Sequence, residues 1–350
     1  MIKETDSTYF SQVFYPWRRF LARSFDISMY NILWSVFLAF IFHVNVAARS
    51  GSETLLDTFI VFIMMLFLEP LFLRLFGTTP GKFIFGLRIE NPDGEHLFYN
   101  EGLDRTLRVI GTGMGYNIPI YNIIRLLKSY TLCRENEIQP WDESISYTIK
   151  DTKWYRGLFY IVASIASFAV LFTIMSAQLL PPNKGDLTVA EFAENYNYYA
   201  NLFDIDLGDE YMNETGKWEK KKTDGSVIYI GLNEKPEYHF TMENGYLTGV
   251  SFAIETENEE SFITPYDKQM FLSSLAFACA QNEMRLFSKI PNRIADKIDN
   301  NIFKDYNFAE AGITFMCDIE YSGYRETQSH LMFPSNTDEN YFSLKFSMNK

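Results

Sequence analysis

GLFYIVASIASFAVLFTIMSAQ (157–178) and ISMYNILWSVFLAFIFHVNVAA (27–48) decide the fold, because each stretch holds 22 residues without a Lys, Arg, Asp or Glu. A helix rises about 1.5 Å per residue, so each stretch can cross the roughly 30 Å hydrocarbon core of a bilayer. A third stretch, 58–73, is apolar except for Glu69 and is followed by Arg74. The sequence predicts an α-helical membrane domain with three transmembrane helices, at about 24–48, 58–76 and 157–178.

The stretch 107–127 is also apolar, but Gly111, Gly113, Gly115 and Pro119 lie in its middle. Glycine and proline argue against one straight helix. Basic residues flank the stretch on both sides, and basic flanks favour the cytoplasm. We therefore expect a re-entrant or interfacial helical hairpin at about 107–127, a cytoplasmic N-terminus and a C-terminal domain outside the cell.

Charge divides the chain into two unlike halves. Residues 1–185 hold 17 Lys and Arg against 16 Asp and Glu, whereas residues 186–350 hold 14 against 28. An acidic domain repels phosphate backbones, which excludes nucleic acid as a partner. We expect a cytoplasmic segment (1–15), a membrane domain (16–178), a linker (179–186) and an acidic extracytoplasmic α+β domain (187–350).

Charged residues in the predicted spans form a candidate site. Arg19, Arg23 and Asp26 are spaced to share one helical face. Glu69 and Arg74 lie near the end of the second span, which places Glu69 at a depth similar to that of Asp26. Two hypotheses remain open: a salt-bridge cluster that locks two helices together, or a site at which Asp26 and Glu69 take protons or cations.

The run GTTPGK (77–82) follows the second span. It is not a phosphate-binding loop, because that loop needs four residues between its glycines and a Ser or Thr after the lysine. The run predicts a turn leaving the membrane, with Lys82 facing lipid headgroups. We expect 86–90 to pair with 144–150 as a small cytoplasmic sheet.

Residues 16–154 resemble the RDD family of bacterial membrane proteins in the segments RRFLARSFD (18–26), GTTPGKFIFGLRIENPDGEHLF (77–98), DRTLRV (104–109) and WDESISYTIKD (141–151). The resemblance implies that Arg19 and Asp26 are two signature residues, and that Glu143, with Asp142 beside it, takes the place of the third. It also assigns a family turn to Gly77, Pro80, Gly81, Lys82, Gly86 and Arg88. Transport of an ion or small ligand has been proposed for the family.

The second half predicts an α+β domain with a mostly antiparallel sheet. Thr188 to Glu191 is a capping box that opens a helix. Hairpin turns are expected at Asp224-Gly225 and Asn244-Gly245. A long helix is expected from Thr264 to about Lys289, and a shorter one from Asn292. Residues 313–321 and 342–348 alternate as strands do.

We find no pattern typical of a catalytic, metal or cofactor site, and we expect no enzyme. His239 and His330 lack partners at metal-ligand spacing. Cys279 and Cys317 form either a disulfide or two buried thiols, and Cys133 is expected to be free. The cluster 255–260 indicates a solvated loop, with weak cation binding as the alternative.

These observations leave two functions open for a multi-pass protein of the bacterial plasma membrane. The membrane domain moves an ion or small solute, or it is an anchor, assembly or sensor module whose outer domain binds a partner or ligand. Three spans are few for a transport path. We therefore expect, besides the lipid bilayer, a homo-oligomer or another membrane protein as partner.

Overall fold

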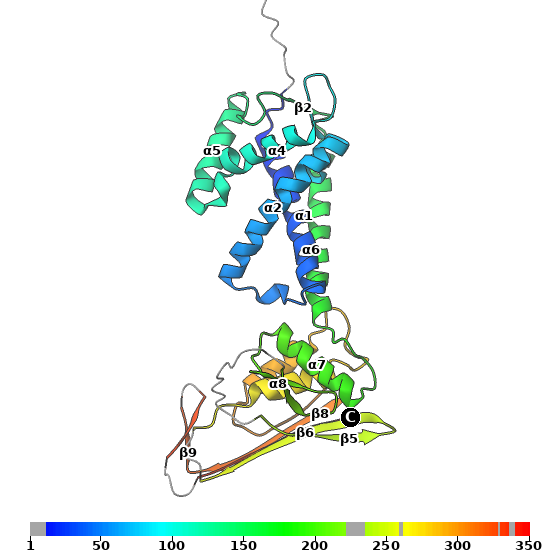
Figure 1. The fold of residues 1–350 in the computed structure, drawn as a ribbon, viewed down its shortest axis with the longest axis vertical. Helices are drawn as coiled ribbons and strands as arrows, with labels where there is room; N and C mark the ends of the chain where they lie inside the picture. The colour runs from blue at the N-terminus through cyan, green and yellow to red at the C-terminus, as the bar shows by residue number, and fades with distance from the viewer. Residues whose placement is uncertain (1–11, 222–234, 259–261, 328–329, 336–339) are drawn as a thin grey trace, which may run out of the picture. The chain divides into compact units, whose positions relative to one another are not determined.

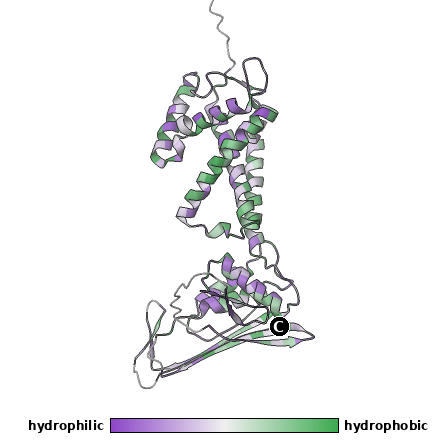
Figure 2. Cartoon of the chain, in the orientation of Figure 1, coloured by the Kyte–Doolittle hydropathy of each residue, from purple (hydrophilic) through white to green (hydrophobic). Residues whose placement is uncertain are grey.

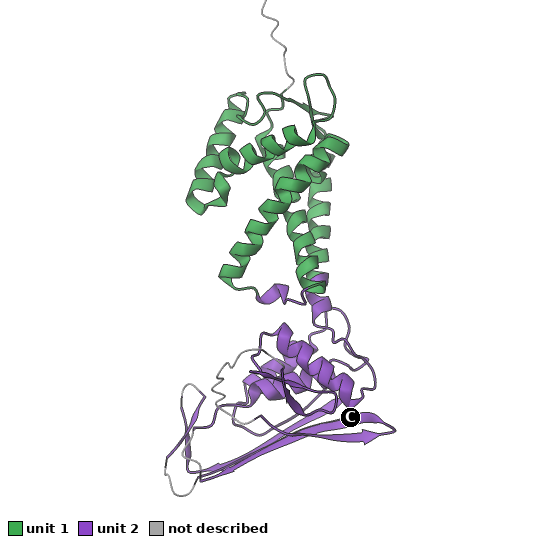
Figure 3. Cartoon of the chain, in the orientation of Figure 1, with its two compact units in different colours: residues 1–41, 49–172 green, residues 42–48, 173–350 purple. Residues whose placement is uncertain are grey.

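The computed structural model describes residues 12–221, 235–258, 262–327, 330–335 and 340–350. The chain separates into two compact units, residues 1–41 with 49–172 and residues 42–48 with 173–350 (Figure 3). The boundary falls inside the last helix of the membrane domain, just before the predicted linker. The predicted turn at Asp224-Gly225 and part of the acidic cluster 255–260 lie outside the described residues.

The first unit is built mainly of helices (Figure 1). Two of them, α2 and α6, are long and apolar enough to cross a membrane. Their apolar colouring is visible along most of their length (Figure 2). The helices are α1 (Pro16–Phe40), α2 (Gly51–Phe76), α3 (Pro80–Ile84), α4 (Tyr99–Arg108), α5 (Pro119–Arg134) and α6 (Tyr155–Gln178).

Helix α1 corresponds to the first predicted span but is shorter than expected. It ends at Phe40, and the chain then turns and forms the short helix η1 (Val46–Ala48). His43 has a positive φ of 53°, which an α-helix does not accept. The predicted helical stretch to residue 48 is therefore wrong at its end, and the count of three spans stays a prediction.

The region of the expected hairpin is helical and broken in its middle, over a longer range than predicted, and a re-entrant or interfacial hairpin stays a prediction. Helix α4 runs into one π-helical turn, η2 (Val109–Gly113), and then a 3₁₀ turn, η3 (Gly115–Asn117), before α5 starts at Pro119. The break comes where the glycines cluster, as the sequence indicates. Ile120, Ile123, Ile124 and Leu127 are exposed along one face of α5. This apolar face favours contact with lipid.

The predicted small sheet is confirmed. Strand β1 (Leu87–Glu90) pairs antiparallel with β2 (Ser146–Ile149), and Leu87 lies opposite Ile149. The buried residues of this pair pack with the N-terminal half of α1 and the end of α2 in one core. The sheet thereby fixes the loop before β2 against α1.

The second unit is an α+β domain around one antiparallel sheet, as predicted. The sheet has the order β5-β6-β11-β8-β7. Its strands are β5 (Tyr238–Glu243), β6 (Tyr246–Glu257), β7 (Tyr306–Glu310), β8 (Ile313–Ser322) and β11 (Tyr341–Asn349). Short two-stranded pairs join β3 (Glu210–Met212) to β4 (Trp218–Lys220) and β9 (Tyr324–Glu326) to β10 (Met332–Pro334).

The sheet and three helices share one hydrophobic core. The helices are α7 (Val189–Leu202), α8 (Asp267–Ala278) and α9 (Ile290–Asp299). Figure 1 shows α7 and α8 on one side of the sheet. The predicted capping box opens α7, with both of its hydrogen bonds formed. The hairpin at Asn244-Gly245 also forms, between β5 and β6.

Two predictions for this domain need correction or completion. The long helix ends at Ala278 rather than at Lys289. Beyond it the backbone no longer forms helical hydrogen bonds, and the carbonyl oxygen of Ala280 accepts a hydrogen bond from the N–H of Gly185 instead. Cys279 and Cys317 are both buried and free, so the alternative of two buried thiols holds.

Candidate functional site

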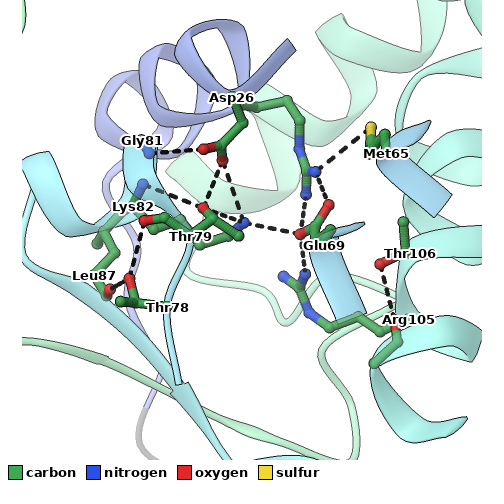
Figure 4. Close-up of polar contacts among 12 residues, drawn as sticks. Asp26, Met65, Glu69, Thr78, Thr79, Gly81, Lys82, Leu87, Arg105 and Thr106 are labelled. Carbon is green, nitrogen blue, oxygen red and sulfur yellow. Dashed lines mark hydrogen bonds and ion pairs between the residues drawn. The ribbon is translucent and has the colours of Figure 1, made fainter. Parts of the chain in front are cut away.

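Glu69 is the centre of a buried cluster of charges in the membrane domain (Figure 4). It lies in α2 directly before Pro70 and has no solvent exposure. Arg23 of α1 donates to both of its carboxylate oxygens, one bond being 2.9 Å long. Lys82 Nζ lies 2.8 Å from Glu69 Oε1, and Arg105 Nη1 lies 3.3 Å from the same oxygen. Three cations from three different helices therefore meet one carboxylate.

Asp26 holds the turn after α2 against α1 (Figure 4). The Thr79 hydroxyl donates to Asp26 Oδ2 at 2.6 Å, and the Gly81 N–H donates to Oδ1 at 2.7 Å. Lys82 Nζ lies 3.8 Å from Asp26 Oδ2. A Cβ on Gly81 would lie 2.0 Å from the carbonyl oxygen of Ala22, so only glycine permits this close approach.

Asp142 forms the second half of the cluster. It is fully buried just before β2 and pairs with Arg19 of α1. Arg105 reaches it with Nη2 at 2.9 Å and Nε at 3.1 Å. The guanidinium of Arg19 also lies over the ring of Tyr147, 4.4 Å from its centroid, where a cation–π contact is favourable.

Arg105 joins the two halves, because it binds both Glu69 and Asp142. It reaches them because α4 packs closely on α2: a Cβ on Gly102 would lie only 3.0 Å from the Cα of Pro70. Gly102 is one helical turn before Arg105 on the same face. The missing side chain at Gly102 thus lets the guanidinium of Arg105 reach the two carboxylates.

The cluster has one more cation than carboxylates. Its cations are Arg19, Arg23, Lys82 and Arg105, and its carboxylates are Asp26, Glu69 and Asp142. Burial lowers the pKa of Lys82 to about 8, with Arg23 and Arg105 acting in the same direction and Glu69 in the opposite one. Lys82 is therefore the cation that most easily becomes neutral near physiological pH.

The electrostatics of Asp142 differ from those of Lys82. Burial alone would raise the pKa of its carboxyl, but the guanidinium groups of Arg19 and Arg105 hold the pKa below its usual value. Asp142 is therefore a carboxylate at neutral pH.

Two predicted site residues lie elsewhere. Arg74 is exposed, because five residues along a helix turn its side chain about 140° away from Glu69. Glu143 is exposed as well, and its neighbour Asp142 takes the buried position. The family offset favoured Glu143, but Asp142 is the acid that belongs to the buried cluster.

Three residues of the cluster were not assigned to it from the sequence. Lys82 was expected at lipid headgroups but is 3% exposed, and Thr79 and Arg105 were assigned no role in the site. Lys82 and Arg105 both lie in segments that resemble the family, and this was the sequence feature that could have pointed to a role in the site. The remaining motif residues shape the turn: Gly77 has φ 66° at the end of α2, Pro80 starts α3, Gly86 has φ 68°, and Arg88 is half exposed beside Glu90.

A cavity of about 400 Å³ opens beside the cluster. It lies between α1, α5 and the η2 turn, and all four cations of the cluster line it. Within the described part of the chain, the charge cluster included, no group of three or more His, Cys, Asp and Glu could hold a metal ion. The geometry offers fixed positive charge at the edge of an apolar space.

Comparison with known proteins identifies a family for the first half of the chain only. The sequence profile of the RDD family matches residues 15–184. That range contains every residue of the charge cluster and of the turn that follows α2. No curated protein and no solved structure matches the chain.

Proposed function

Residues 15–184 belong to the RDD family, and on this premise we propose that this membrane protein takes part in the transport of an ion or small solute. In this proposal the charge cluster is the site that binds the transported ion or exchanges protons. The observation that carries the proposal is the excess of one buried cation over the carboxylates. Uncompensated buried charge is costly, so the cluster favours either loss of a proton or binding of a counter-ion.

Lys82 is the proposed proton-exchanging group. Its Nζ lies between Glu69 and Asp26, so its neutral and charged forms interact differently with both helices that carry these acids. A pKa of about 8 gives both forms substantial populations at physiological pH. Glu69, which accepts bonds from three cations, is better suited to hold the helices together than to carry the proton itself.

The proposed arrangement in the cell places the N-terminus in the cytoplasm and the second domain outside a bacterial plasma membrane. Basic residues flanking the spans support this orientation. The small number of spans supports assembly with a second copy or another membrane protein. We propose that neither domain is an enzyme and that the acidic second domain has a binding role.

The test uses purified full-length protein in liposomes that contain a pH-sensitive dye. Pulses of external Na⁺, K⁺ or Li⁺ are expected to change internal pH for the wild type. Lys82→Arg keeps the positive charge but cannot release its proton at working pH, so we expect the pH change to fall at least about tenfold. Lys150→Arg, at an exposed position, is the matched control and retains wild-type flux.

A second function, that of an anchor or assembly module, is favoured by the complete pairing of Glu69 and Asp142. Absence of any pH change from wild-type protein shown to be folded and inserted would support this alternative. Equal flux from wild type and Lys82→Arg would refute the proton role of Lys82 while leaving transport in place.

A further inference from the structure

The cavity beside the charge cluster has the character of a ligand site. Its volume of about 400 Å³ falls in the range of small-molecule pockets. Every residue that lines it belongs to the membrane domain. Most of the lining is aromatic or aliphatic. The four charged side chains lie together, because they share Glu69 and Asp142 as partners, and we call this part the charged end.

The charged end of this cavity is wholly positive. Arg19, Arg23, Lys82 and Arg105 line it, and no described carboxylate does. The side chains of Arg19 and Arg23 keep 13% and 14% of their surface exposed, whereas their partners Asp142 and Glu69 keep none. The carboxylates thus lie behind the guanidinium groups, which leaves donor groups turned toward the cavity.

The apolar end is formed by α1 and α5. Ile123 and Leu127 line the cavity and also belong to the exposed apolar face of α5. On α1, Trp17 and Phe20 line the cavity and are 64% and 43% exposed. The cavity wall therefore continues into surfaces suited to the acyl region of a bilayer.

We propose that this cavity binds an anionic phospholipid of the surrounding bilayer. The headgroup phosphate accepts hydrogen bonds from Arg19 and Arg23, whose planar guanidinium groups suit phosphate oxygens. One acyl chain lies between α1 and α5. The bound phosphate supplies the negative charge that the cluster lacks. Any role of this lipid in transport rests on the proposed function, but its binding does not.

The test is a titration of the full-length protein in neutral detergent, followed by native mass spectrometry. The probes are phosphatidylglycerol and phosphatidylcholine with identical chains. We expect one phosphatidylglycerol to bind at least about tenfold more tightly than phosphatidylcholine, because only the anionic lipid neutralises the cluster. Equal binding of the two lipids would overturn the proposal and indicate ordinary annular lipid.

Two variants locate the site. Arg19→Gln is expected to weaken phosphatidylglycerol binding at least about tenfold, while Arg74→Gln, the same change at an exposed position, leaves it within about twofold. Equal effects of the two would overturn the site. Should Arg19→Gln fail to elute as a folded species, Leu126→Trp fills the cavity, keeps all four cations and is expected to weaken binding similarly.

Inorganic phosphate separates a lipid site from a site for a free anion. At millimolar concentration it is expected to leave the bound lipid in place, because it gains nothing from the apolar wall. Displacement of the lipid, together with unchanged phosphate binding by Leu126→Trp, would overturn the lipid assignment. Since no ion gradient is present, failure here is distinct from failure of the flux assay.

Discussion

Replacement of Glu69 by Gln tests whether the charge cluster holds the membrane domain together. Of the three cations around this carboxylate, Lys82 keeps Asp26 and Arg105 keeps Asp142 as partners. Among the described residues, Arg23 has hydrogen bonds only to Glu69 and, at 3.8 Å, to Met65 Sδ. The variant therefore leaves one buried guanidinium without its counter-charge.

Breaking a buried ion pair by removing one partner costs about 3–5 kcal/mol. For a domain of this size, 1 kcal/mol corresponds to about 2–4 °C in the midpoint of unfolding. We expect Glu69→Gln to melt about 6–20 °C below the wild type. Fluorescence-detected thermal unfolding in one detergent measures the shift, and the relative midpoints suffice even where unfolding is irreversible.

Two further variants make the result specific. Glu143→Gln changes an exposed acid and is expected to shift the midpoint by less than about 2 °C. The double variant Glu69→Gln with Arg23→Met removes the orphaned cation, and we expect it to melt above Glu69→Gln alone. A wild-type midpoint for Glu69→Gln, or additive losses in the double variant, would refute this account of the cluster.

Gly81→Ala places a methyl group against a backbone carbonyl of α1 and should cost about 1–3 kcal/mol in thermal unfolding, whereas Gly157→Ala, with open space around it, should be neutral or slightly stabilising. The folded-state pKa of Lys82 lies below its unfolded value, so the unfolded chain binds more protons between about pH 8 and 10.5. The midpoint temperature of wild-type unfolding should therefore gain a contribution that increases from about pH 8 to 10.5, and Lys82→Met should lack it. Identical dependence of the midpoint on pH in the two proteins would contradict this account. Burial raises the pKa of both Cys279 and Cys317 to about 12, so neither should react with maleimide in the native protein at neutral pH. Both should react after denaturation without reductant, and labelling only after reduction would reveal a disulfide.

Much of the cluster followed from helical spacing and hydropathy. Arg23 and Glu69 were both placed near the cytoplasmic ends of their spans, and the structure joins them. Arg74 was included because it is close in sequence, but helical geometry sends it to the surface. Contacts between helices depend on rotation about each axis, which a single apolar run does not determine.

The choice between Asp142 and Glu143 shows a different limit of prediction from sequence. Asp142 and Glu143 are adjacent, and the family offset pointed to Glu143. Only the turn before β2 decides which of them faces Arg19 and Arg105. Lys82 was missed for a related reason: α3 is too short to show a periodic pattern, so its buried face was invisible. In the second domain, the alternation of apolar residues in 313–321 was sufficient to predict a strand, because a half-buried sheet imposes a period of two.

Strand β11 lies at the middle of the five-stranded sheet of the second domain, between β6 and β8, although it follows both of them in the sequence. A ribosome that has finished β8 must still add the residues up to 349, which takes about one to five seconds at ordinary rates of synthesis. Until β11 has emerged and paired, β6 and β8 have no partner on their inner edges, and such edges readily pair with foreign strands. The second domain is thus expected to be most vulnerable to misassembly late in its own synthesis, after all residues of the charge cluster have been made.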